Sequence, residues 1–204
     1  MATILHINSS VRNTGSISRQ LTAEFLSKWQ AVQPADMIVE RDLAANPVPH
    51  LTEQMMGAFF TPAEQRSPEQ AQTVQLSDDL VAELLSADTI VLGAPMYNFS
   101  VSSTLKAWID HVARAGLTFK YTETGPVGMV QGKKVYIFTS RGGVYSQGPA
   151  KSMDFHETYL RAVLGFIGLT DITFIHTEGL AMGDAAVADA LTQTRQAIGE
   201  LVAA

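Results

Sequence analysis

Five short apolar segments, each separated from the next by a longer stretch, constrain the fold of this chain most strongly. They are Thr3–Ile7, Met37–Val39, Thr89–Gly93, Lys134–Phe138 and Asp171–Ile175. Short runs that are apolar throughout suit strands buried on both faces of a parallel sheet. After the first run, large apolar residues recur every four positions, at Ile17, Leu21, Phe25 and Trp29. This spacing is that of a helix with one buried face, so the chain begins with a strand–helix–strand unit.

The alternation of strands and helices continues to the end of the chain. Further helices are expected over 67–85, 103–114, 159–166 and 187–202, with a short one around 53–56. This order predicts an α/β fold with one doubly wound, five-stranded parallel sheet that is covered by helices on both faces. Of the known strand orders we expect 2-1-3-4-5, the flavodoxin-like order. The 204 residues suit a single domain over 1–204, with one excursion at 43–67 that prolines interrupt.

The composition excludes several kinds of chemistry. The chain has no cysteine, which rules out disulfides, thiolate catalysis and cysteine-ligated zinc or iron–sulfur centres. Its five histidines form no metal-binding motif, so we expect no metal. The net charge is −6 and Lys133–Lys134 is the only adjacent basic pair, so no nucleic-acid partner is expected. Neither a signal peptide nor a membrane-spanning apolar run is found, which predicts a cytoplasmic protein with no membrane partner.

The loops that follow the first, third and fourth predicted strands hold the most informative residues. Parallel strands end at the same edge of a sheet, and ligands bind there, near the point where the strand order reverses. The first of these loops, 9–18, combines serine and threonine hydroxyls with the start of a helix. Free backbone N–H groups and the helix dipole favour a phosphate at such a place. The alternative is that Ser16 only caps the helix.

The other two loops carry aromatic residues and glycines. Loop 93–100 contains Tyr97, Asn98 and Phe99, which can pack on a flat ring system and bind its polar edge, although the two aromatic rings could instead plug the core. Loop 139–145 contains Gly142–Gly143, which permit positive φ and close approach of the backbone to a ligand, or form a plain turn. Phosphate donors, an aromatic wall and close backbone contact together describe a phosphorylated planar ligand, and FMN is such a ligand.

These loops also carry residues by which the chain resembles the FMN-dependent NADH-azoreductases, a family within the flavodoxin-like NAD(P)H:quinone and azo reductases. The matching segments are Ala94–Phe99, Leu105–Lys106, Ala113–Phe119, Tyr121–Glu123, Gly125–Pro126, Thr139–Gly143 and Gly165–Gly168. The resemblance covers essentially the whole chain. Its M-Y-N-F and S-R-G-G segments are specific as a combination.

The resemblance implies a function and a set of cofactor contacts. It implies bound FMN, NADH or NADPH as co-substrate, and a homodimer with FMN near the subunit interface. It implies ping-pong reduction of quinones and aromatic azo compounds. By motif position, the phosphate of FMN would be bound by Ser10, Ser16, Ile17 and Ser18. The isoalloxazine ring would be held by Met96, Tyr97, Asn98, Phe99, Ser140, Arg141, Gly142 and Gly143.

The chemistry implied needs no catalytic side chain, because the flavin transfers the hydride and the protein positions it. We therefore expect no catalytic acid or base, and we expect backbone N–H groups to stabilise the anionic reduced flavin. Phe60, Tyr121 and Tyr145 are candidates for the walls of a flat substrate pocket, or for ordinary packing. Two alternatives stay open: a one-electron carrier of the flavodoxin type, and a flavin-free binding protein on the same scaffold.

Overall fold

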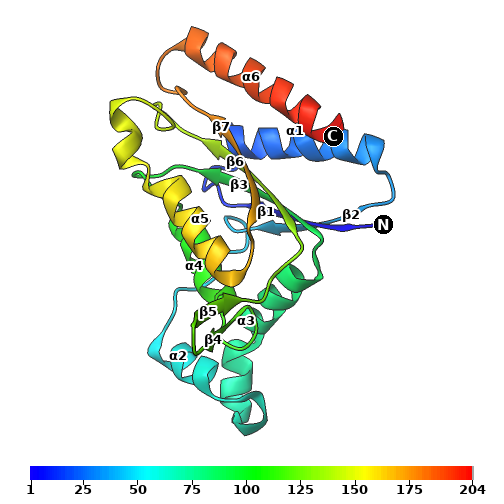
Figure 1. Ribbon diagram of the computed structural model, residues 1–204, viewed down its shortest axis with the longest axis vertical. Helices are drawn as coiled ribbons and strands as arrows, with labels where there is room; N and C mark the ends of the chain where they lie inside the picture. Colours follow the sequence, from blue (N-terminus) through cyan, green and yellow to red (C-terminus); the bar gives the residue numbers. More distant parts are fainter. Residues whose placement is uncertain (204) are drawn as a thin grey trace.

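The sheet at the centre of the molecule is parallel and has five strands (Figure 1). The structure is a computed structural model that describes residues 1–203. The strand order is β2-β1-β3-β6-β7, and every neighbouring pair is parallel. The strands span Thr3–Asn8 (β1), Met37–Asp42 (β2), Thr89–Pro95 (β3), Lys134–Ser140 (β6) and Asp171–Thr177 (β7). Counted within this sheet alone, the order is 2-1-3-4-5, which confirms the predicted flavodoxin-like order.

Helices lie on either side of this sheet (Figure 1). On one side, α1 (Ile17–Val32) and α6 (Asp184–Ala203) pack next to each other. The other side carries α3 (Pro68–Ser86), α4 (Ser103–Val112) and α5 (Phe155–Ile167). Three further helical elements are short: α2 (Glu53–Phe60), η1 (Ala63–Gln65) and η2 (Pro149–Met153). No helix within residues 1–203 combines the length and the apolar character that crossing a membrane requires.

Local capping signals explain where two of the helices begin. The Ser67 hydroxyl accepts the backbone N–H of Gln70 at 3.2 Å, and the Gln70 side chain accepts the N–H of Ser67 at 3.0 Å. This capping box, followed by Pro68, starts α3 where the sequence predicted it. Asp154 caps α5, which therefore begins before the predicted stretch at 159–166. In contrast, α4 ends at Val112, two residues earlier than predicted.

Alternate residues of the strands build two hydrophobic cores, one on each face of the sheet. The core toward α1 and α6 contains Ile4, Val91 and Phe138. The core toward α3, α4 and α5 contains the residues in between, such as Leu5 and Leu92. Because successive side chains of a strand point to opposite faces, a strand that serves both cores needs apolar residues on both of its faces.

A hairpin outside the main sheet was not predicted. β4 (Phe119–Thr122) and β5 (Gly125–Gly128) form an antiparallel pair. β5 consists of two glycines, a proline and a valine, so its sequence carries little strand signal. Gly128 passes so close to the end of α5 that a Cβ there would lie 2.2 Å from the backbone nitrogen of Gly168. This crossing accepts only glycine, and it joins the hairpin to α5.

Candidate functional site

A cavity opens at the carboxyl edge of the sheet, where the three predicted loops meet. Its volume is about 300 Å³. Residues of all three loops line it, among them Ser10, Ser16, Met96, Tyr97, Ser140 and Gly142. These loops follow β1, β3 and β6, the strands around the point where the strand order reverses. The structure therefore brings most of the predicted cofactor-binding residues to one place.

A second cavity adjoins the first. It measures about 640 Å³ and is lined by Tyr97, Asn98, Lys106 and Tyr159 among others. Tyr97 lines both cavities, so the aromatic loop lies between the first cavity, which the serine-rich loop lines, and the larger second one.

The serine-rich loop presents hydrogen-bond donors at the start of α1. The Ser16 hydroxyl accepts the N–H of Arg19 at 3.5 Å and lies 3.3 Å from the Ser18 hydroxyl. Ser16 is thus a helix cap, but the first N–H groups of an α-helix, here those of Ile17 and Ser18, have no partner within the helix. Ser10 is buried, and its hydroxyl lies 3.4 Å from that of Tyr97. Hydroxyls and free N–H groups in this arrangement suit an anion such as phosphate.

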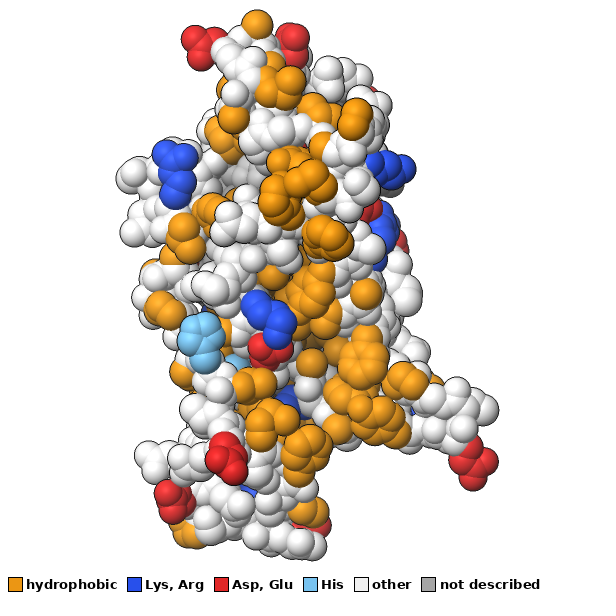
Figure 2. Space-filling model, turned by 90° about the vertical axis from the view of Figure 1, so that its left-hand side faces the viewer, with side chains coloured by type: hydrophobic (Ala, Val, Ile, Leu, Met, Phe, Trp, Pro, Cys, Tyr) orange, Lys and Arg blue, Asp and Glu red, His pale blue; other side chains and the backbone are white. Residues whose placement is uncertain are grey.

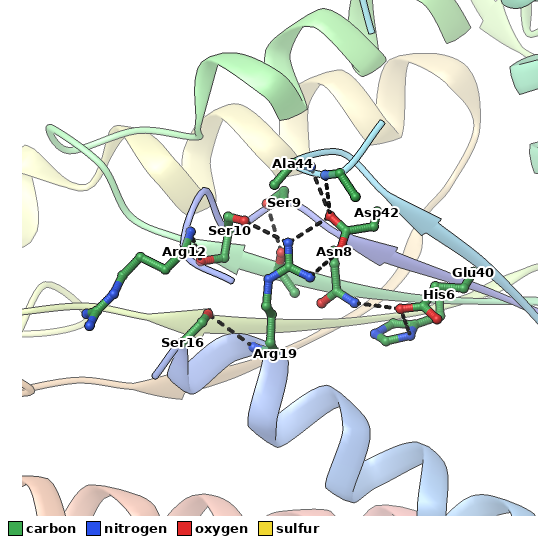
Figure 3. Close-up of polar contacts among 12 residues, drawn as sticks. His6, Asn8, Ser9, Ser10, Arg12, Ser16, Arg19, Glu40, Asp42 and Ala44 are labelled. Atoms are coloured by element: carbon green, nitrogen blue, oxygen red, sulfur yellow. Dashed lines mark hydrogen bonds and ion pairs between the residues drawn. The ribbon is translucent and has the colours of Figure 1, made fainter. Parts of the chain in front are cut away.

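Arg19 and Asp42 tie this loop to the end of β2 (Figure 3). Arg19 Nη2 donates to the carbonyl oxygen of Ser10 at 2.8 Å. The two terminal nitrogens of Arg19 also donate to both carboxylate oxygens of Asp42, at 2.6 and 2.7 Å. These hydrogen bonds from Arg19 lower the pKa of Asp42 to about 2. Sequence reasoning missed this pair, because its members lie 23 positions apart and belong to no motif.

The aromatic loop after β3 contains an unusual turn. Within residues 1–203, Asn98 (φ 48°) and Phe99 (φ 70°) are the only non-glycine residues with positive φ. They form the centre of a turn in which Tyr97 and Ser100 exchange backbone hydrogen bonds of 2.9 and 3.0 Å. A residue held in this region costs of order 1–3 kcal/mol. Phe99 is 38% exposed, so it does not plug the core, and the alternative interpretation of this ring is excluded.

The glycine loop after β6 uses close packing rather than positive φ. The sequence allowed positive φ at Gly142 and Gly143, but neither residue adopts it. What Gly143 provides is space, because a Cβ there would lie 3.2 Å from the ring of Tyr145. The Tyr145 ring meets that of Phe99, with ring centres 6.1 Å apart and planes at 74°. The glycine loop and the aromatic loop therefore share one edge of the site.

Arg141 lines the cavity, but its side chain points elsewhere. The side chain is fully buried, and its Nη1 binds Asp154 and Glu178 at 2.8 and 3.0 Å. These partners place the guanidinium group toward the start of α5 and the end of β7. The backbone N–H of Arg141 donates to the carbonyl oxygen of Thr177 at 2.9 Å, and its carbonyl oxygen accepts the N–H of Leu180 at 3.1 Å. Both backbone groups of Arg141 therefore already have partners within the chain.

The three aromatic residues considered for a substrate pocket do not meet within one chain. Tyr145 lies beside the cavity at the strand ends, as described above. Phe60 is 73% exposed and lines a different cavity of about 490 Å³. Tyr121 lies on β4, is 74% exposed and packs on Phe119 with ring centres 5.5 Å apart. A pocket walled by all three residues is therefore not formed by a single chain.

The donor set at the carboxyl edge fits a ligand with a phosphate at one end and a flat ring at the other. The anion-binding groups come from loop 9–18 and the start of α1, and the apolar and aromatic groups come from Met96, Tyr97 and Phe99. FMN has this construction. A ligand without a phosphate would leave the hydroxyls of loop 9–18 and the N–H groups at the start of α1 without an anion to bind.

Proteins that are similar to this chain in sequence support the same ligand. A family model described as a flavodoxin-like fold matches residues 2–202. An FMN-dependent NADH:quinone oxidoreductase of Herminiimonas arsenicoxydans is 64% identical over 204 residues, which are 100% of both chains. An FMN-dependent NADH:quinone oxidoreductase 2 of Pseudomonas fluorescens (strain Pf0-1) is 55% identical over 183 residues, which are 90% of each chain.

Solved structures give the same result. An azoreductase from Bacillus anthracis str. Sterne has a TM-score of 0.92 and 30% identity, with 99% of each chain covered. An FMN-dependent NADH-azoreductase from Bacillus anthracis str. Ames Ancestor, solved in complex with FMN, has a TM-score of 0.86 and 25% identity, with 98% of this chain and 99% of that chain covered. The resemblance seen in the sequence motifs is confirmed. The chain belongs to the flavodoxin-like fold family and, within it, to the FMN-dependent NADH:quinone oxidoreductases and azoreductases.

Proposed function

We propose that this protein is an FMN-dependent oxidoreductase that takes hydride from NADH or NADPH and reduces quinones and aromatic azo compounds. The products are hydroquinones and aromatic amines, and the two substrates react in turn, in a ping-pong sequence. The observation that carries this proposal is the 64% identity, over the full chain, to an FMN-dependent NADH:quinone oxidoreductase. The name of that relative favours NADH as the donor and weighs against a one-electron carrier.

The loops at the carboxyl edge hold the cofactor in this proposal. Loop 10–18 binds the phosphate of FMN through serine hydroxyls and the N–H groups that begin α1. Residues 96–99 pack against the ring system, and the backbone at 140–143 approaches its polar edge. When bound, FMN supplies the hydride chemistry, so no catalytic acid or base is assigned. The backbone N–H groups of the two later loops stabilise negative charge at the ring edge.

The proposal includes a homodimer with the cofactor near the interface. On the side of the molecule that carries α2, α4 and α5, hydrophobic side chains form a band (Figure 2). Near the start of α5, Met153 and Phe155 are 40% and 61% exposed. Phe99, at the edge of the site, is also exposed. Contact with a second copy would remove this apolar surface from water, which supports an interface beside the site.

Three further assignments belong to the proposal. A single domain over 1–204 is supported by two cores that share one sheet. A doubly wound arrangement is supported by helices on both sides of that sheet (Figure 1). A cytoplasmic location suits an enzyme that consumes NADH and small aromatic substrates.

Initial-rate kinetics test the proposed reaction. NADH oxidation is measured while the concentrations of NADH and of a benzoquinone, or of an aromatic azo dye, are both varied. Parallel double-reciprocal lines are expected, because the first product leaves before the second substrate binds. Intersecting lines would refute the ping-pong sequence. Absence of NADH oxidation in protein supplied with FMN would refute the proposed activity itself.

A further inference from the structure

A group of three charged side chains lies behind the glycine loop. Arg141 is fully buried, and its Nη1 lies 2.8 Å from Asp154 Oδ2 and 3.0 Å from Glu178 Oε1. Arg141 directly follows β6, Glu178 directly follows β7, and Asp154 caps the N-terminus of α5. The cluster thus joins three elements at the edge of the sheet where the cofactor site lies. Buried ion pairs stabilise a protein only when further hydrogen bonds satisfy them, so the other partners of these carboxylates matter.

Glu178 binds the backbone as well as the arginine. Its Oε1 accepts the N–H groups of Tyr145 at 2.9 Å and of Ser146 at 3.0 Å, and its Oε2 accepts the Ser146 hydroxyl. Burial by itself would raise the pKa of Glu178, but these hydrogen bonds and Arg141 lower it. The ionised carboxylate is therefore an anchor for the chain at 145–146.

The stretch at 144–147 differs from the residues before it in how its backbone is held. The residues just before it are held by backbone pairing, in which Leu180 and Ala181 donate to the carbonyl oxygens of Arg141 and Gly142 at 3.1 and 2.9 Å. The last bond of this series is donated by the N–H of Gly179 to the carbonyl oxygen of Gly143, at 3.1 Å. Within residues 1–203, the backbone of 144–147 makes no hydrogen bond except the two to Glu178.

The position of Tyr145 matters because its ring lies at the edge of the cofactor site. Gly143 leaves room for this ring, and the ring meets Phe99 of the strained turn after β3. Removing the anchor at Glu178 would free the backbone of Tyr145 and separate its ring from Phe99.

We propose that Glu178 is a positioning residue of the flavin site, which holds residues 144–146 in the conformation that binds the cofactor. It acts through the loop and lies outside the predicted set of cofactor contacts. A loop that is ordered before binding loses less conformational entropy when the ligand arrives, so the cofactor binds more tightly. The inference rests on the proposed FMN site and extends it.

Three variants of the full chain test this role: Glu178→Ala, Glu178→Gln and, as a matched control, Glu24→Ala. Glu24 also pairs with an arginine, since Arg195 donates to both of its carboxylate oxygens at 2.9 Å, but this pair joins α1 and α6 at the surface. Serial dilution of the holoprotein, with free flavin read by fluorescence, gives the FMN dissociation constant. Hydrogen exchange followed by mass spectrometry reports separately on the backbone amides at 145–146.

We expect Glu178→Ala to raise the dissociation constant about tenfold or more and to speed exchange at 145–146. Glu178→Gln keeps an acceptor for the two N–H groups, and a neutral acceptor bonds roughly half as strongly, so an increase of about threefold is expected. Glu24→Ala should leave both readouts unchanged. Constants within about twofold of wild type for the Glu178 variants would overturn the proposal, as would an equal loss in Glu24→Ala.

Failure of Glu178→Ala to fold and failure of the wild-type protein to retain FMN have different consequences. If Glu178→Ala does not fold, Glu178→Gln decides by the same criterion. If the wild-type protein does not retain FMN at any concentration, the proposed function fails. The exchange data then decide by themselves whether Glu178 holds the loop, because unchanged exchange at 145–146 in Glu178→Gln contradicts the inference.

Discussion

Asn98 and Phe99 hold the least favourable backbone conformation in the site. Asparagine tolerates the left-handed region better than most residues, whereas phenylalanine does so rarely. Such residues persist where the surrounding structure forces them, and they cluster at binding sites. The turn presents the exposed Asn98 side chain beside the cavity, and its amide offers both a donor and an acceptor. Binding of a ligand by this amide would explain why the strain is kept.

Two substitutions at Asn98 separate the amide from the backbone. Asn98→Gly and Asn98→Ala both remove the amide, but only glycine adopts φ of 48° without strain. We expect both variants to weaken FMN binding about tenfold, and Asn98→Ala to lose about 1 kcal/mol of unfolding free energy besides. FMN titration and urea unfolding measure the two effects. Unchanged affinity in both variants would exclude a role for the amide, and a loss in Asn98→Ala alone would assign the effect to the backbone.

The residues that face the cavity were predictable, whereas those that support them were not. Ser10 and Tyr97 are found by following each predicted strand to its end. Arg19 reaches the site through a carbonyl nine positions away, and Glu178 through amides more than thirty positions away. No local pattern records such contacts. The burial of the Arg141 side chain is a consequence of the same kind of long-range pairing.

Among the elements, the buried strands were the easiest to predict. The central strands β1, β3 and β6 supply buried residues to both cores, so they are mainly apolar, whereas β2 ends with three charged residues and has no buried one. The β4–β5 hairpin was missed because its stability comes from tertiary contacts, in which Phe119 packs on Phe166 with ring centres 4.3 Å apart and Gly128 touches the end of α5. The start of α5 was missed because its signal is a capping aspartate rather than a periodic apolar face.

The pairing of α1 with β2 through Arg19 and Asp42 predicts a pH dependence. The pKa of Asp42 in the folded protein is about 2, below the ordinary 3.8, so its ionised form stabilises the fold. This contribution is complete above about pH 4 and is lost as the pH falls toward 2. It is at most about 2 kcal/mol, and screening by water reduces it.

Asp42→Asn tests this linkage. The difference in unfolding free energy between wild type and variant should be largest near neutral pH and should shrink between about pH 4 and pH 2. Urea unfolding at several pH values measures it. Asp79→Asn on α3 is the control, since that exposed carboxylate contacts the amide of Gln75. A difference for Asp42→Asn that is constant across this range would show that the ion pair contributes nothing through its charge.

At the scale of the whole molecule, strand order determines where the site lies. The order reverses between β1 and β3, and the loops after these strands and after β6 form the cavity. The sequence predicted this edge because the alternation of elements leaves few topologies for a parallel sheet. A single chain does not bring Phe60, Tyr121 and Tyr145 together.

The proposed dimer predicts the molecular mass in solution and its response to a charge at the start of α5. Light scattering should give about twice the 22.0 kDa of one chain. Phe155→Asp, at a side chain that is 61% exposed, should shift the protein toward the monomer because a charge is costly to bury. Val32→Asp is the matched control, since Val32 is 57% exposed at the end of α1, on the other side of the sheet. A wild-type mass of one chain at micromolar concentration would contradict the dimer.

Anaerobic titration of the holoprotein with NADH tests the central claim most directly. If the site holds FMN and accepts hydride from NADH, a stoichiometric amount of NADH bleaches the visible absorption of the flavin in one two-electron step. Addition of a quinone or an aromatic azo dye then restores the absorption. A spectrum that NADH leaves unchanged, together with a stable one-electron reduced flavin on photoreduction, would contradict the account and identify an electron carrier instead.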